Sequence, residues 1–145
     1  MTAVHRLFVF GTLQAGHRNF HINRSTRVGG HWVTAQPHPL YVIGRHRLPW
    51  LLNRPGQGVP VIGQLYAVDD TTLADMDRLE RTDDPLWYER RQVAVRPHPG
   101  PADAPAQTVW VYFGSEAGFA DQLVHAGPID HYSLSVAAEH PLRLP

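Results

Sequence analysis

The sequence predicts an α+β fold: a small mixed β-barrel or curved sheet of about six strands, with one main helix and short additional helices. Six segments rich in β-branched and aromatic residues are bounded by Gly and Pro, which is typical of strands. Only one segment has strong helical periodicity, so helices do not alternate with strands. Neither G-x-x-x-x-G-K nor G-x-G-x-x-G is present, which argues against a doubly wound nucleotide-binding fold. The expected strands lie near residues 4–10, 28–36, 39–44, 59–68, 88–97 and 107–113.

Composition narrows the function classes. The 145 residues fit one domain over positions 1–145. The 13 Lys and Arg residues balance 13 Asp and Glu residues, so no nucleic-acid or anionic-membrane partner is expected. Without cysteine the chain has no disulfide and no thiolate nucleophile, and no apolar run is long enough to span a membrane. We expect a cytoplasmic monomer or homodimer with a small-molecule partner.

The first strand and the loop after it form the first candidate site. Leu7 to Phe10 are apolar at every position, which indicates a central strand covered on both faces. Gly11 allows a sharp turn or the close approach of a ligand. Backbone N–H groups at such a turn can bind a carboxylate or carbonyl oxygen. The alternative is a buried strand followed by an ordinary turn.

The next segments carry weaker signals. His17 and His21 are four residues apart, but the pattern offers no third ligand, so we predict a short helix or loop and no metal site. The second strand contains Gly29-Gly30, which predicts a bulge.

A bulky apolar run at Leu48–Leu52 contains a proline. Pro49 cannot donate to a central ladder, so this run is expected to form an edge strand or a loop packed on the core. Two interpretations remain open for Trp50: packing in the core, or walling a ligand pocket.

The clearest helix follows the fourth strand. Asp69-Asp70 offers an N-cap, and the helix is expected over Thr71–Glu80. At about 100° per residue, Glu80 falls at about 340° from Leu73, inside the apolar stripe that Leu73 and Met76 define.

A carboxylate at such a position has several possible environments. It finds a partner, has its pKa raised by desolvation, or faces an internal cavity. A pKa near neutrality suits a general acid/base. Alternatively, Glu80 lies at a frayed helix end, where its carboxylate turns to water or pairs with Arg81 or Arg90.

The remainder of the chain contains two strands and a weak tail. The segment 88–97 alternates as a strand with one wetter face, and 97–105 is expected to be a surface loop. The last strong strand is 108–113. In the tail, 121–125 is expected to form a turn of helix and 130–139 a short helix.

These residues carry a family resemblance. Phe8-Val9-Phe10-Gly11-Thr12-Leu13 resembles the F-V-Y-G-[ST]-L motif of the γ-glutamylcyclotransferase-like (AIG2-like) superfamily. Segments 63–69, 76–80 and 88–90 match the second block of that family in order and spacing. The run 39–58 is most similar to the γ-glutamylamine cyclotransferase branch. The resemblance covers residues 6 to about 113.

The resemblance implies a cyclotransferase. The α-amino group of a γ-glutamyl-amine attacks the γ-carbonyl, giving 5-oxo-L-proline and a free amine without metal or organic cofactor. By resemblance, Glu80 is the catalytic carboxylate, and backbone donors of Gly11, Thr12 and Leu13 cradle the glutamyl group. If so, Glu80 and these three residues should face one pocket.

Three aromatic residues complete the implied substrate site. Tyr88 is expected to hydrogen-bond the substrate or Glu80, and Trp50 to line the pocket. Phe10 stands where the family usually has Tyr and lacks that hydroxyl group. Two alternatives stay open: a non-catalytic binder of a small carboxylate or γ-glutamyl ligand, and a biosynthetic enzyme that removes a γ-glutamyl protecting group.

Overall fold

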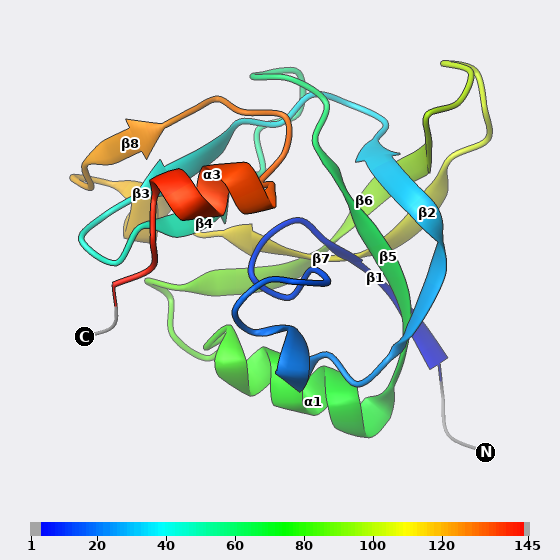
Figure 1. Cartoon of the computed structure of the whole chain (residues 1–145), viewed down its shortest axis with the longest axis horizontal. Coiled ribbons are helices and arrows are strands. Elements are labelled where there is room, and N and C mark those ends of the chain that lie inside the picture. Colours follow the sequence, from blue (N-terminus) through cyan, green and yellow to red (C-terminus); the bar gives the residue numbers. More distant parts are fainter. Residues whose placement is uncertain (1–3, 144–145) are drawn as a thin grey trace.

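The computed structural model describes residues 4–143, which form two sheets (Figure 1). The first is a closed barrel and the second has three strands. In spatial order the barrel contains β1 (Val4–Val9), β5 (Ile62–Asp69), β2 (Thr26–Thr34), β6 (Tyr88–His98) and β7 (Gln107–Gly114). The second sheet contains β4 (Leu48–Leu51), β3 (Leu40–Ile43) and β8 (Val124–Ala126). The α+β prediction with a mixed barrel is confirmed; the ends of the expected 1–145 domain lie outside the described residues.

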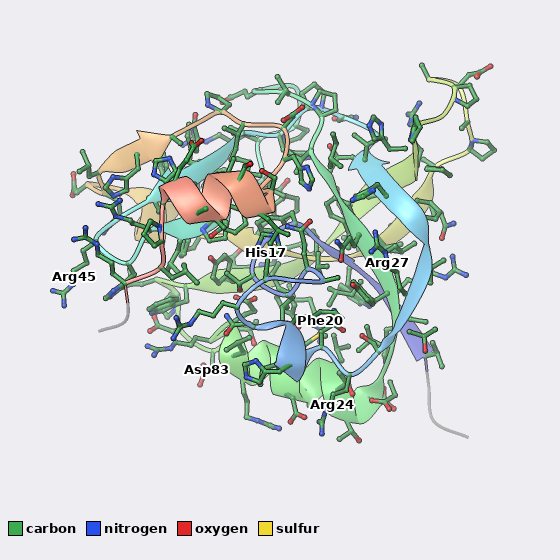
Figure 2. All side chains as sticks on the ribbon, viewed as in Figure 1. His17, Phe20, Arg24, Arg27, Arg45 and Asp83 are labelled. Carbon is green, nitrogen blue, oxygen red and sulfur yellow. The ribbon has the colours of Figure 1, made fainter. Side chains whose placement is uncertain are left out.

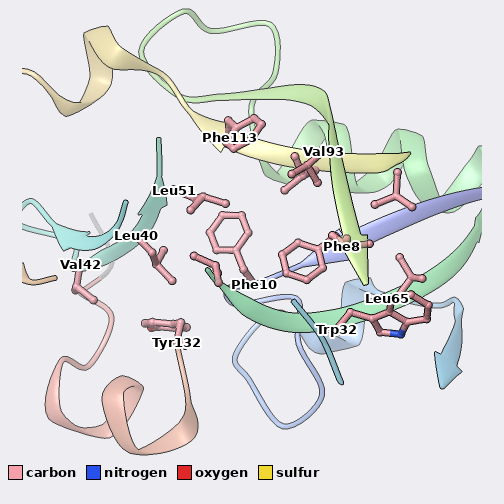
Figure 3. Close-up of a cluster of buried hydrophobic side chains, with 14 residues drawn as sticks. Phe8, Phe10, Trp32, Leu40, Val42, Leu51, Leu65, Val93, Phe113 and Tyr132 are labelled. Carbon is pink, nitrogen blue, oxygen red and sulfur yellow. The ribbon is translucent and has the colours of Figure 1, made fainter. Parts of the chain in front are cut away.

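Strand β1 occupies the central position that its continuous apolar run predicts. It pairs antiparallel with β5 and parallel with β7, which closes the barrel. Successive side chains of a strand point to opposite faces. Phe8 and Phe10 accordingly enter one buried cluster, shown in Figure 3, whereas Leu7 and Val9 enter a second. Both faces of β1 are therefore covered by protein.

The main helix, α1 (Asp70–Leu79), follows β5 directly and lies along one side of the barrel (Figure 1). Asp69 caps it by accepting a hydrogen bond of 2.7 Å from the Thr72 amide. Leu73 and Met76 are buried on its inner face. Glu80, expected as the last helical residue, is the C-cap.

Two further features of the sheets agree with the sequence prediction: a register shift in β2 and the edge position of β4. The pairing of β2 with β5 shifts register between Arg27 and His31, where the two glycines predicted a bulge. Strand β4 pairs with β3 alone in its sheet, which makes it the edge strand that Pro49 requires.

The tail packs onto the barrel and differs from the expectation at one point. Residues 124–126 form β8, paired with β3, where a turn of helix was predicted. Tyr132, 1% exposed, joins the barrel cluster (Figure 3). The remaining helical segments are η1 (Phe20–Ile22), α2 (Glu116–Phe119) and α3 (Leu134–Glu139), the last within the predicted range. Within residues 4–143, no helix is long and apolar enough to cross a membrane.

Candidate active site

One small cavity collects most of the predicted site residues. Its volume is about 20 Å³. Its wall is formed by five parts of the chain: the end of β1 with the loop after it, β4, the end of α1, β6 and β7. The lining residues are Phe8, Val9, Phe10, Gly11, Thr12, Leu13, Pro49, Glu80, Tyr88 and Tyr112. The structure thus brings Glu80 and residues 11–13 to the same cavity, although they lie far apart in the sequence.

Glu80 enters the cavity from the C-terminus of α1. Its backbone N–H still bonds to the carbonyl of Met76 at 2.9 Å, so the helix fixes its position. Arg81 then adopts a left-handed conformation (φ 53°) that turns the chain away. The residue as a whole keeps partial exposure, whereas burial of its carboxyl group raises the pKa of Glu80 to about 8.

The carboxyl group of Glu80 has no hydrogen bond or ion pair within the described part of the chain. The two arginines considered as partners are engaged elsewhere. The Arg81 guanidinium lies 4.5 Å from the centre of the Trp87 ring, and Arg90 pairs with Asp77 at 2.9 Å. Desolvation is therefore not offset by a counter-charge, which leaves Glu80 with the proton affinity of a general acid/base.

The backbone carbonyl groups of the loop 11–13 are hydrogen-bonded, whereas its N–H groups are not bonded to any described residue. Its three carbonyl oxygens accept hydrogen bonds from Gln14 N, Asn19 N and Asn23 Nδ2 at 3.1, 2.9 and 3.1 Å. None of its three N–H groups donates to another described residue. Backbone N–H groups inside proteins are rarely left unpaired, which makes these three groups candidate donors to a ligand.

Gln14 ties this loop to the tail. Its Nε2 atom lies 2.9 Å from the carbonyl of Phe10, 3.1 Å from that of Gly11 and 2.8 Å from that of Tyr132. The amide has two hydrogens, so one of them is shared between neighbouring acceptors. The side chain is 1% exposed. The tail thus supports the loop 11–13, called the donor loop below, through the buried side-chain amide of Gln14.

Two tyrosines, Tyr88 and Tyr112, also line the cavity. Tyr88 donates its hydroxyl proton to the carbonyl of Pro49 at 2.6 Å and not to Glu80. Tyr112 donates to Asp77 at 2.7 Å, and Arg90 binds the same carboxylate oxygen. Burial raises the pKa of both tyrosines, which keeps both hydroxyl groups protonated. Tyr112 is not predictable as a site residue from the sequence, because it lies within an apolar strand with nothing to distinguish it from core residues.

Trp50 does not line this cavity. It is 3% exposed and donates from Nε1 to the carbonyl of Ser115 at 3.0 Å. Its ring packs against Tyr88 with 4.5 Å between centroids. Alternation along β4 explains the difference, because Pro49 takes the face toward the cavity and its neighbour Trp50 takes the other.

The two histidines considered as metal ligands lie outside the cavity and do not form a metal site. The His17 ring packs on Tyr132 with 5.3 Å between centroids, and His21 lies exposed in η1. Within residues 4–143, no group of three or more His, Asp or Glu side chains is placed to hold a metal ion.

Comparison with known proteins gives the family. The family described as gamma-glutamyl cyclotransferase, AIG2-like, matches residues 7–131, most of the chain. The chain belongs to this family. It is therefore an enzyme of the γ-glutamylcyclotransferase type.

Individual members of the gamma-glutamyl cyclotransferase, AIG2-like family agree. The chain is 34% identical over 139 residues to a gamma-glutamylaminecyclotransferase from Homo sapiens, covering 87% of this chain and 88% of that protein. It is 32% identical to the Bos taurus protein of the same name, over 94% of this chain and 79% of that protein. The crystal structure of an AIG2-like protein from Mus musculus superimposes with a TM-score of 0.75 at 26% identity, covering 98% and 97% of the two chains.

Proposed function

We propose that this protein converts a γ-glutamyl-amine into 5-oxo-L-proline and a free amine. The observation that carries the proposal is the meeting of an unpaired, desolvated carboxyl group, Glu80, with three unpaired backbone donors in one cavity. Family membership supports the reaction type. The gamma-glutamylaminecyclotransferase name of the human and bovine relatives supports the substrate class.

The reaction forms one bond and breaks one. The substrate's α-amino nitrogen bonds to its γ-carbonyl carbon, and the bond from that carbon to the leaving nitrogen breaks. Because the nucleophile is tethered to the electrophile, little entropy is lost in bringing them together. The enzyme must remove a proton from the α-ammonium group, stabilise negative charge on the carbonyl oxygen and protonate the leaving nitrogen.

Glu80 is assigned the proton transfers. As a carboxylate it takes one proton from the ammonium group, and as a carboxylic acid it passes that proton to the departing nitrogen. The attacking nitrogen loses a second proton as it becomes the lactam nitrogen, and this proton ends on the released amine, which leaves as its ammonium form. A pKa of about 8 suits both roles, since the group then exchanges protons readily near neutral pH. Residues on its own helix that carry charge, such as Asp77, are already paired and do not compete for the proton.

The backbone N–H groups of Gly11, Thr12 and Leu13 are assigned the binding of the glutamyl group. Prearranged donors in a site that excludes water stabilise developing negative charge strongly. Phe10 supplies an apolar wall beside them and no hydroxyl group.

The cavity is closed in this structure. A volume of about 20 Å³ holds about one water molecule. A γ-glutamyl group therefore enters only when lining residues move apart. Pro49, which lies against Gly11, is part of the wall that must yield.

The test follows 5-oxoproline release from a panel of γ-glutamyl-amines and γ-glutamyl dipeptides. Glu80→Gln is expected to abolish release while ligands still raise the melting temperature. Glu139→Gln, at an exposed carboxylate of α3, is the matched control and should keep full turnover. Full turnover by Glu80→Gln would overturn the assignment of Glu80. Ligand stabilisation of the wild type without any product would instead identify a binding protein.

A further inference from the structure

A second and larger hollow lies on the other side of β4. Its volume is about 410 Å³, within the range of small-molecule sites. Leu48 and Trp50 line it, whereas Pro49 between them lines the catalytic cavity. Because alternate residues of a strand point to opposite faces, β4 separates the two spaces. The hollow is therefore not an extension of the catalytic cavity.

Its walls are aromatic. The Trp50 ring is fixed by its hydrogen bond to Ser115 and by its packing on Tyr88. Trp87 lies 6.4 Å from Trp50 between ring centroids, inclined at 57°. Leu86 also lines the hollow and is 58% exposed, an unusual amount for a large apolar side chain. These surfaces suit a flat apolar body.

The ionisable side chains that line the hollow are both basic. They are Arg45 and His46, and no Asp or Glu is among the lining residues. Arg45 is exposed and takes part in no ion pair within the described residues; Figure 2 shows it at one end of the molecule. His46 Nδ1 lies 2.7 Å from the carbonyl oxygen of Arg143. A carbonyl can only accept, so Nδ1 carries the proton of that bond and Nε2 is left free for another partner.

We propose that this hollow is a second ligand site, for a small aromatic carboxylate. The partly exposed Trp87 and the exposed Leu86 would take the ring of the ligand over the buried edge of Trp50, and Arg45 would pair with its carboxylate. A cationic ligand would face the positive rim without a counter-charge. This site is distinct from the one at which the γ-glutamyl group is proposed to react.

The experiment uses three probes with one ring system and different charges: 2-naphthoate, 2-naphthalenemethanol and 2-naphthylmethylammonium. Their dissociation constants are measured by calorimetric titration of the full chain at neutral pH and low salt. The anion is expected to bind at least about fivefold more tightly than the neutral probe, and the cation most weakly. Equal affinity of the anion and the neutral probe, or no binding of any probe, would overturn the proposal.

Three variants locate the binding. Arg45→Glu should remove the preference for the anion, while Arg27→Glu, the same charge change at an exposed residue on the far side of the molecule (Figure 2), should keep it. Ala117→Trp places a large ring at a lining position and should abolish binding, with folding checked by circular dichroism. Glu80→Gln should leave the affinity unchanged. If Glu80→Gln alters binding and Ala117→Trp does not, the probe occupies the catalytic cavity and the second site is refuted. No step of this test depends on turnover.

Discussion

The hydroxyl group of Tyr88 donates a hydrogen bond of 2.6 Å to the carbonyl oxygen of Pro49. This bond joins the first residue of β6 to the edge strand β4, and both residues line the cavity that contains Glu80. On the same side, Pro49 approaches Gly11 so closely that a β-carbon there would lie 2.9 Å from its Cγ atom. The edge strand is thus held against the donor loop, and the cavity wall depends on both contacts.

Removing the Tyr88 hydroxyl should weaken this wall. Tyr88→Phe leaves the buried carbonyl of Pro49 without a partner, which is expected to cost about 1–3 kcal/mol in the free energy of unfolding. Urea denaturation measures the loss. Tyr41→Phe is the control, because the Tyr41 hydroxyl makes no hydrogen bond to described residues. Equal stability changes in the two variants would contradict the role given to this bond.

The activity should follow the ionisation of Glu80. Because burial raises the pKa of Glu80 to about 8, the carboxylate needed as base is scarce at lower pH. We expect kcat/KM to rise about tenfold per pH unit from about pH 6 and to level off near pH 8. The measurement is the initial rate of 5-oxoproline release across that range, with Glu139→Gln giving the same curve. A profile that stays flat between about pH 6 and 8 would exclude Glu80 as the base.

Glu80→Gln should also stabilise the fold, and only at higher pH. The pKa of Glu80 rises from 4.5 to about 8 on folding, so the stability that its protonated form contributes is complete below about pH 4.5. That contribution is lost progressively as the pH rises toward 8, because the unfolded chain releases the proton in this range while the folded state keeps it; above about pH 8 the folded state holds a buried carboxylate. The neutral amide avoids this loss. The variant should match the wild type near pH 4.5 and exceed it by roughly 1–3 kcal/mol above pH 8.

Urea denaturation at several pH values measures that difference. Glu139→Gln replaces an exposed carboxylate and should show no comparable change with pH. A gain for Glu80→Gln that is as large at pH 4.5 as at pH 8.5 would mean that desolvation of the charge is not its cause.

Gly11→Ala should disturb the cavity through sterics alone. The added β-carbon, 2.9 Å from Pro49 Cγ, forces the proline ring to shift. The expected effects are a loss of about 1–2 kcal/mol in stability and about a tenfold fall in kcat/KM. Gly30→Ala provides the control, since a β-carbon there meets no heavy atom within 4 Å. Unchanged kinetics in Gly11→Ala would show that the contact with Pro49 does not shape the site.

Local patterns in the sequence were enough to predict most of the fold. The cap at Asp69 and the apolar stripe of Leu73 and Met76 predict α1, and the run ending at Phe10 predicts a strand covered on both faces. Strand β8 was missed because its existence depends on a partner far away in the chain. Val124 pairs with Ile43, and its own three-residue segment, with one exposed and two partly buried residues, is too short to show alternation.

The site was predictable in part for the same reason. The angular position of Glu80 on its helix predicts that its side chain points inward. The place of Gly11 at the end of a strand predicts a turn at that point. The position of Trp50 depends on which face of β4 meets the barrel, and a run apolar on both faces does not reveal that. Tyr112 required the fold itself, because its partner Asp77 lies 35 residues earlier.

The amide of Gln14 has a consequence for how the enzyme assembles. It bonds at once to the exit of β1 and to the carbonyl of Tyr132 near the end of the chain. The loop 11–13 therefore loses one of its supports when the segment around Tyr132 is absent, and we expect a chain that ends before Tyr132 to be less active. A single cut before Tyr132 should likewise expose the amide protons of Gln14 and Asn19, which donate to the carbonyl groups of Gly11 and Thr12, to rapid exchange with solvent deuterium, long before the barrel itself unfolds.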